Sequence, residues 1–416
     1  MPVRLLITHI GRLLQVEEGE ARIIVKAGSA MGQVACIEDA YLLIEGNRIL
    51  DFGKMGNIPQ TGAGIREIDA KNGFVLPSWC DSHTHLVFAG FREKEFEDRI
   101  GGKSYAQIAS GGGGILYSMQ MMAKASEREL METALQRLEE IRSMGTGAVE
   151  IKSGYGLSLE GELKMLRVIR SLRALTPLSI KSTFLGAHAF PPEYRRDHEG
   201  YIRLITEQML PAIAAEGLAD YMDVFCEKGF FSARESGRLL EAGWKYGLKP
   251  KVHANQLHRS GGIQMAVKHK AVSADHLEKT GRRELQCLKG SGTIATLLPA
   301  SALFLDLSYR DTARSLIRAG IPVALASDYN PGSCPSGNMP LVMSLGCMQL
   351  KMTPAEVINA VTVNGAAAME LGNSHGSIAR GKMASIVITS PMPSLAFFPY
   401  RFGSDLIRRV IIAGEG

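Results

Sequence analysis

Histidine and aspartate residues recur along this sequence at the ends of short apolar runs. "LPSWCDSHTHL" carries His83 and His85 two positions apart, while "KVHANQ" and "LASDYNPGS" carry His253 and Asp328. Side chains two positions apart in a strand point to the same face, so His83 and His85 can reach one common atom. Three imidazoles and one carboxylate suit Zn²⁺ or Fe²⁺/Fe³⁺. The pattern predicts one metal ion per chain, held by these four residues.

A divalent cation held in this way would supply a nucleophile. It lowers the pKa of a bound water from about 15.7 toward about 7, which produces hydroxide at neutral pH. Asp328 could take the proton of that water, and His276 in "SADHLE" could polarise a carbonyl group or shuttle protons. Asp81, two positions before His83, could orient a ligand histidine. His188 ends a further apolar run, "FLGAHA".

The other five histidines are interpreted as ordinary core or surface residues: His9, His198, His258, His269 and His375.

The apolar runs alternate with amphipathic segments. This order predicts a (β/α)8 barrel, in which the C-terminal strand ends form the active-site mouth. A doubly wound open sheet is the alternative, but no G-x-G-x-x-G opens a helix after an early strand. The candidate strands are 74–79, 148–152, 178–185, 221–226, 249–254, 271–276, 292–298 and 321–327.

One segment predicts its helix in detail. Ser126 can cap a helix over 126–144 and Glu129 can close a capping box. Apolar residues of this segment fall on one face, and Gly145 supplies the stop.

Both ends of the chain look β-rich. Residues 1–75 contain short β-branched runs separated by Gly and Asn, and residues 381–416 have the same character. Chain termini often lie close together, so the two ends could form one small β-sandwich domain. The predicted organisation is therefore an α/β barrel over 76–380 flanked by two halves of a β-sandwich.

Composition narrows the class of protein. The chain has 416 residues, of which 45% are hydrophobic and 21% charged, and its net charge is +5. The basic residues are spread out, so no nucleic-acid partner is expected. No apolar stretch has membrane-spanning length, and no signal peptide is apparent. The six cysteines are scattered without a C-x-x-C pair, which favours reduced thiols and a cytoplasmic location.

Seven motifs together resemble the imidazolonepropionase family of the amidohydrolase superfamily. They are "DSHTHLVFAGFR", "EIKSGYGL", "TFLGAHA", "DVFCEKG", "KVHANQL", "SADHLE" and "SDYNPGS". The resemblance runs in order from about residue 74 to residue 335, and "KSGYGL" and "NPGS" are its most specific parts. It implies a barrel with a β-sandwich, and hydrolysis of 4-imidazolone-5-propanoate to N-formimidoyl-L-glutamate in histidine degradation. It also implies the four metal ligands named above.

The same resemblance assigns the substrate contacts. It implies that Arg92, Tyr105, Tyr155 and His188 hold the substrate, and that Asn330, Gly332 and Ser333 contact the ring or its opened product. One position departs from the family, which often has an acidic residue where this chain has Gln256. Glutamine cannot act as a general base, so it is given a hydrogen-bonding role and proton transfer falls to His276 and Asp328. Ser385, in "GKMAS", is expected to alter only a turn.

The substrate is a small cyclic amide with a carboxylate tail, which Arg92 can grip through a two-pronged hydrogen bond. Taken alone, Arg92 could equally pair with Glu93, Glu95 or Glu97 on the surface, and "NPGS" could be an ordinary turn. Tyr155 could be a plain loop aromatic, and His188 a core histidine.

Three other questions stay open. Another cyclic amidohydrolase or a purine-type deaminase would share the metal ligands, and a non-catalytic metal-binding barrel would keep them without turnover. Zinc and iron both fit the ligand set. A homodimer is an expectation from the family alone.

Overall fold

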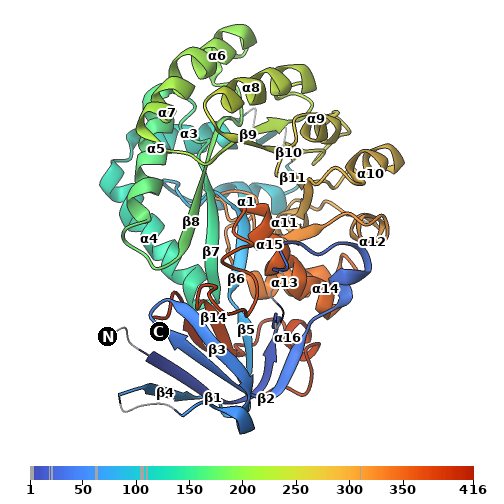
Figure 1. Ribbon diagram of the computed structural model, residues 1–416. Coiled ribbons are helices and arrows are strands. Elements are labelled where there is room, and N and C mark those ends of the chain that lie inside the picture. Colours follow the sequence, from blue (N-terminus) through green and yellow to red (C-terminus); the bar gives the residue numbers. More distant parts are fainter. Residues whose placement is uncertain are drawn as a thin grey trace.

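The computed structural model describes residues 4–17, 19, 22–60, 64–103, 107–108, 111–309 and 311–416. Its larger part is an eight-stranded sheet whose strands follow one another in chain order, and every neighbouring pair is parallel (Figure 1). The strands are β6 (Trp79–Thr84), β7 (Thr146–Lys152), β8 (Ser179–Ala187), β9 (Tyr221–Cys226), β10 (Lys249–Ala254), β11 (Ser273–His276), β12 (Ile294–Leu297) and β13 (Val323–Leu325).

The first and last of these strands meet just beyond β13. The backbone N–H of Asp328 donates to the carbonyl of His83 (3.0 Å), and that of His85 donates to the carbonyl of Tyr329 (2.8 Å). The carboxylate of Asp81 accepts hydrogen bonds from the backbone N–H (3.0 Å) and hydroxyl (2.6 Å) of Ser327. These contacts close the sheet into the predicted (β/α)8 barrel.

Helices follow the strands and cover the outside of the barrel (Figure 1). They are α1 (Glu93–Ile100), α3 (Ile115–Lys124), α4 (Glu127–Ser143), α5 (Leu159–Leu172), α6 (His198–Leu204), α7 (Leu210–Glu216), α8 (Ala233–Lys245), α9 (Gly262–Lys268), α10 (Arg282–Leu288), α11 (Pro299–Phe304), α12 (Thr312–Arg318), α13 (Met339–Met348), α14 (Pro354–Val361), α15 (Val363–Ala368) and α16 (Phe397–Tyr400).

Helix α4 has the details expected from its sequence. The hydroxyl of Ser126 accepts from the N–H of Glu129 (3.2 Å), and the Glu129 carboxylate accepts from the N–H of Ser126 (2.8 Å). Its expected apolar face, Leu130, Ala134, Leu138 and Ile141, is buried. Gly145 follows with a φ of 96°, a left-handed conformation that glycine adopts without strain.

Both ends of the chain join one seven-stranded sheet, as the sequence predicted. Its order is β15-β14-β5-β1-β2-β3, and β4 pairs with β1. Apolar residues from both ends share its core, among them Ile7, Leu42, Ile386 and Ile411. The strands are β1 (Arg4–Leu14), β2 (Cys36–Glu45), β3 (Arg48–Lys54), β4 (Arg66–Asp69), β5 (Phe74–Pro77), β14 (Ile386–Thr389) and β15 (Ile407–Ile411).

The segment 74–79 differs from the expected single barrel strand. Its first part is β5, which pairs with β14 in the terminal sheet, and only Trp79 belongs to the barrel strand β6. Pro77, which has no backbone N–H to donate, ends β5. The apolar run therefore leads from one sheet into the next, and His83 and His85 lie at the end of β6.

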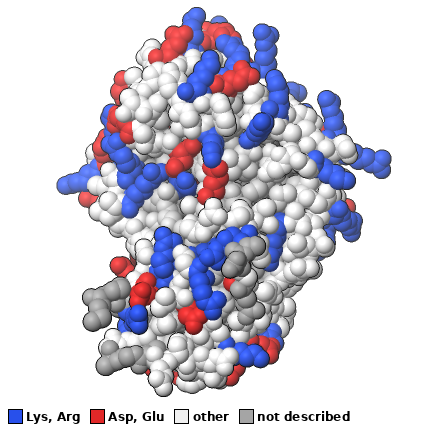
Figure 2. All heavy atoms as spheres, in the orientation of Figure 1, with Lys and Arg blue, Asp and Glu red and all other residues white. Residues whose placement is uncertain are grey.

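Charges are spread over the surface that Figure 2 displays, with Lys and Arg side chains interspersed with Asp and Glu. All six cysteines are free thiols. None of the helices formed by the described residues combines the length and the apolar character needed to cross a membrane.

Candidate active site

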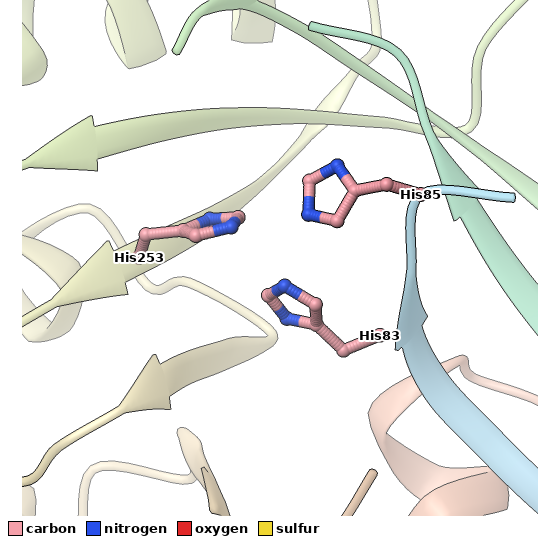
Figure 3. Close-up of side chains that lie close together, drawn as sticks. All are labelled: His83, His85 and His253. Atoms are coloured by element: carbon pink, nitrogen blue, oxygen red, sulfur yellow. The ribbon is translucent and has the colours of Figure 1, made fainter. Parts of the chain in front are cut away.

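Three imidazoles converge at the mouth of the barrel. His83 and His85 come from the end of β6 and His253 from β10, and their rings point toward one another (Figure 3). One ligand nitrogen from each lies within 4.8 Å of the others. The Oδ1 atom of Asp328 lies 3.7 Å from Nε2 of His83 and 3.7 Å from Nε2 of His85. The structure thus brings the four predicted ligands together.

The donor set fits a divalent cation. Metal–nitrogen bonds of about 2.1 Å in a tetrahedral site place neighbouring ligand atoms about 3.4 Å apart. The Oδ1 atom of Asp328 lies 3.7 Å from Nε2 of His83 and of His85, near that separation. Nε2 of His83 is buried and makes no hydrogen bond within the described part of the chain. A buried acceptor nitrogen without a donor is unfavourable unless another group occupies the space in front of it.

Two buried aspartates hold the ligand rings from behind. His83 Nδ1 donates to Asp275 Oδ2 (2.7 Å), which leaves Nε2 with its lone pair toward the site. His253 Nδ1 lies 2.9 Å from Asp223 Oδ2. Carboxylates in this position orient a metal-binding imidazole and increase its basicity.

A fully buried lysine links the two aspartates. Lys152 Nζ lies 2.8 Å from Asp223 Oδ2 and 3.6 Å from Asp275 Oδ2, and it donates to Glu150 Oε1 (2.6 Å). Glu150 also pairs with buried Lys251. Five charged side chains thus occupy the barrel interior, and each has a partner of opposite charge, as burial of charge requires.

Burial and neighbouring charges favour the neutral form of the imidazoles, which is the form that binds metal. Burial, assisted by the charge of Lys152 and the neighbouring rings, lowers the pKa of His83 well below its usual value, and the pKa of His85 is lowered in the same way. Both rings are therefore neutral at physiological pH. Burial opposes ionisation of Lys152, but Asp223 and Glu150 outweigh it and raise the pKa of the ammonium.

A cavity of about 560 Å³ opens onto the ligands, a size suited to a small molecule. The expected site residues that line it are His85, Arg92, Tyr155, His188, His253, Gln256, His276, Asp328, Asn330 and Ser333. Cationic side chains Arg99 and Lys103 and apolar side chains such as Phe225, Phe230 and Phe304 complete its walls. Gly332 lies behind this lining, and Tyr105 lies outside the described residues.

Arg92 is a buried cation and not a surface one. Only 9% of the residue is exposed, and its Nε lies 3.5 Å from Glu95 Oε2. Nε and Nη1 make no hydrogen bond of good geometry among the described residues. Arg92 lines the cavity and is ion-paired with Glu95, so an anionic group in the cavity would meet a guanidinium that already has one acidic neighbour.

The "NPGS" turn is held together by its first residue. Asn330 Oδ1 accepts from the N–H groups of Gly332 (2.9 Å) and Ser333 (2.7 Å), while Nδ2 donates to the carbonyl of Asp328 (2.6 Å). Asn330 thus shapes the loop next to Asp328 in addition to lining the cavity.

Two aromatic residues border His85. His188 stacks on the His85 ring with centroids 5.3 Å apart, and Tyr155 lies 5.7 Å from it. His188 Nδ1 lies 3.0 Å from the carbonyl of Gly154. Burial, with a contribution from His253, lowers the pKa of His188 to about 3, so the ring is neutral.

His276 and Asp328 carry the groups that could move protons. Burial raises the pKa of Asp328, and His276 and hydrogen bonds only partly offset it. For His276 burial opposes the charged form, but the carboxylates of Glu278 and Asp328 outweigh it and raise the pKa. A weakly acidic carboxyl and a basic imidazole therefore face the same cavity.

The sequence reasoning missed the layer behind the ligands. Asp81 was expected to orient a ligand histidine, but it binds Ser327 instead, and Asp275 and Asp223 contact the histidines. A signal was present, because Glu150, Lys152, Asp223, Lys251 and Asp275 are charged residues inside strands expected to be buried. Such residues need partners in the same interior.

Comparisons with known proteins place these features in a family. The profile of the Amidohydrolase family matches residues 74–415. An imidazolonepropionase of Christiangramia forsetii is 52% identical, with 99% of each chain covered. An imidazolonepropionase of Symbiobacterium thermophilum is 43% identical over 100% of this chain and 97% of its own length.

Solved structures share the fold at low sequence identity. A triazine hydrolase variant superposes with a TM-score of 0.75 at 16% identity, covering 99% of this chain and 94% of its own. An adenosine deaminase from Xanthomonas campestris with bound zinc gives a TM-score of 0.71 at 15% identity, covering 100% of this chain and 92% of its own. The fold, the family profile and the full-length similarity lead to one conclusion: the chain belongs to the amidohydrolase family and, within it, to the imidazolonepropionases.

Proposed function

We propose that this chain hydrolyses 4-imidazolone-5-propanoate to N-formimidoyl-L-glutamate, the ring-opening step of histidine degradation. Full-length relatives at 39–52% identity that are named imidazolonepropionase support this activity. The observation that carries it is the pairing of a histidine and aspartate ligand set with buried Arg92 in one cavity. The free thiols suit a reducing compartment, and we place the enzyme in the cytoplasm.

The cation would be held by His83, His85, His253 and Asp328, and zinc and iron both suit these donors. When bound, it supplies a water that is ionised near neutral pH and so provides the nucleophile. Asp328 would accept the proton of that water.

The reaction adds one water across the ring amide. The hydroxyl portion bonds to the carbonyl carbon, the bond between that carbon and the ring nitrogen breaks, and the proton held by Asp328 passes to the leaving nitrogen. His276 donates a hydrogen bond to the carbonyl oxygen as it gains negative charge. Gln256 lines the cavity but cannot exchange protons, so it serves as a hydrogen-bonding residue.

We assign substrate binding to residues that line the cavity. Arg92 would bind the propionate with its available N–H groups, and Tyr155 and His188 would hold the ring beside His85. Asn330, Gly332 and Ser333 shape the turn that faces the substrate.

The test is a turnover assay with 4-imidazolone-5-propanoate on zinc- and iron-loaded protein, with metal content measured per chain. We expect hydrolysis of this substrate and no deamination of purines. His276→Ala should lower kcat while metal content is retained. Bound metal without hydrolysis of any cyclic amide would instead indicate a non-catalytic barrel.

A further inference from the structure

Glu278 is a buried acid that the mechanism above does not use. It lies two residues beyond His276, and only 5% of it is exposed. Neither carboxylate oxygen makes a hydrogen bond of good geometry in the described part of the chain. Its Oε1 lies 3.5 Å from Nδ1 of His276. A buried carboxylate without hydrogen bonds is unfavourable, so its position calls for an explanation.

The backbone between the two residues is strained. His276 and Leu277 have φ values of 81° and 68°, a region that residues other than glycine rarely adopt. Two hydrogen bonds to the chain after β10 hold this conformation, from Leu277 N–H to the carbonyl of Ala254 (3.1 Å) and from Lys279 N–H to that of Asn255 (2.8 Å). The strained turn thereby keeps the carboxylate of Glu278 beside the ring of His276.

Glu278 and His276 face different spaces. His276 lines the cavity that contains the metal ligands, whereas Glu278 lines a neighbouring cavity of about 650 Å³ together with Tyr309 and Arg282. The two cavities share Asp306 and Leu307, and among the described residues that line the first cavity, Glu278 does not appear. The nearest group of the first cavity to the carboxylate of Glu278 that carries chemistry is therefore the ring of His276.

We propose that Glu278 is a positioning residue for His276, an inference whose kinetic part rests on the proposed function. By accepting a hydrogen bond from Nδ1–H, the carboxylate fixes the rotation of the ring and directs Nε2 into the cavity, where the protonated ring can donate from Nε2–H. The two atoms lie 3.5 Å apart without substrate, and catalytic hydrogen bonds commonly tighten once substrate is bound. The position of His276 matters more in this chain because Gln256 cannot exchange a proton.

Two variants of the metal-loaded enzyme separate positioning from charge. Glu278→Ala removes the acceptor and should lower kcat roughly 10- to 100-fold, with KM and metal content unchanged. Glu278→Gln keeps an oxygen that can accept from Nδ1–H, so it should recover most of the lost rate. Both variants lose the same charge, so an equal fall in kcat in both would overturn the positioning role. Wild-type kcat in Glu278→Ala would overturn it as well.

Glu284 provides a matched control. It is also 5% exposed, and it caps α10 by accepting from the N–H of Gly281 (2.9 Å) and accepts from Gln264 Nε2 (3.3 Å). Among the described residues, no ion pair joins it to a histidine. Glu284→Ala should lower the unfolding temperature and leave kcat unchanged. This variant measures what the loss of a buried carboxylate in the same segment does to the fold.

A spectroscopic measurement makes the test independent of the substrate. In zinc-loaded protein carrying ¹⁵N-labelled histidine, Nδ1 of His276 should carry a hydrogen-bonded proton, and Glu278→Ala should shift the Nδ1 signal. An unchanged spectrum would overturn the inference. If the wild-type enzyme left 4-imidazolone-5-propanoate intact, the proposed function would fail, but this spectrum would still decide the role of Glu278.

Discussion

The guanidinium of Arg92 lies directly against the α-carbon of Gly332. A β-carbon at position 332 would lie 1.4 Å from Nη2 of Arg92, far inside van der Waals contact. The backbone N–H of Arg92 also donates to the carbonyl of Pro331 (3.0 Å). The "NPGS" turn and Arg92 therefore pack as one unit. Because glycine has no side chain, position 332 leaves space for the guanidinium of Arg92.

Gly332→Ala should displace Arg92 from the cavity. We expect kcat/KM for 4-imidazolone-5-propanoate to fall about 100-fold, since small misplacements of a binding group have effects of this order. Steady-state kinetics measures the loss. Gly56→Ala is the control, because a β-carbon there meets nothing within 4 Å, and it should have no effect. Wild-type kinetics in Gly332→Ala would contradict the close packing.

Arg92→Ala should reduce recognition of the carboxylate tail. Each charge-assisted hydrogen bond contributes about 1.5–3 kcal/mol, so kcat/KM should fall roughly 10- to 100-fold or more. Arg92→Lys should fall between wild type and alanine, because a lysine offers a point charge without the planar fork. The comparison substrate is the same ring without its propionate, which Arg92→Ala should process as well as wild type. An equal loss on both substrates would argue against a carboxylate clamp and favour a deaminase-like use of the cavity.

Asp275→Asn should weaken metal binding. The carboxylate of Asp275 accepts from Nδ1 of His83, and loss of such a partner typically costs 10- to 100-fold in metal affinity. Competition with a fluorescent chelator measures the dissociation constant. Thr183→Val is the control, since the Thr183 hydroxyl donates to Glu150 (2.6 Å) within the same buried cluster and contacts neither histidine-bonded aspartate. Unchanged metal affinity in Asp275→Asn would show that Asp275 does not contribute to metal binding.

The buried His375 should make stability depend on pH. Burial, with the charge of Lys382, lowers the pKa of His375 from about 6.5 to about 4. As the pH falls, His375 therefore takes up a proton in the unfolded state before it does so in the folded state. Its effect on the free energy of unfolding is most favourable above pH 6.5 and is lost as the pH falls toward 4. The difference corresponds to roughly 3 kcal/mol at most.

His375→Gln removes that titration and should keep hydrogen bonds to Ser179 and Ser374. The thermal unfolding midpoint of the wild type should fall more than that of His375→Gln between pH 6.5 and pH 4. Parallel curves across this window would show that His375 titrates normally in the folded protein.

Much of the fold could be predicted because the sequence patterns that indicate strands and helices extend over a few neighbouring residues. Seven of the eight candidate barrel strands appear with small shifts at their ends, because buried parallel strands read as short apolar runs. The exception is 74–79, where one apolar run serves two sheets. Sequence alone does not show that Pro77 ends one strand and that Trp79 begins another, since both segments are buried and apolar.

The convergence of the four candidate ligands could be predicted because His83, His85, His253 and Asp328 lie at strand ends, and the C-terminal ends of barrel strands meet at one mouth. The groups behind them could not, because pairing of Asp275 with His83, and of Asp223 with His253 and Lys152, depends on three-dimensional contacts between strands far apart in the chain. The substrate roles of Arg92, Tyr155, His188, Gln256, Asn330, Gly332 and Ser333 remain predictions, and Tyr105 lies outside the described residues.

The junction between β6 and the end of β13 has a consequence for biosynthesis. Asp81 and Ser327, which join there, are 246 positions apart, and the ligands His83 and Asp328 lie on either side of the same junction. A nascent chain that has not yet emerged past this point lacks a complete donor set, however well its earlier strands have formed. Binding of an ion by all four residues would therefore require synthesis past residue 328 and closure of the barrel, and the ion would then cross-link the first and last strands of the barrel sheet.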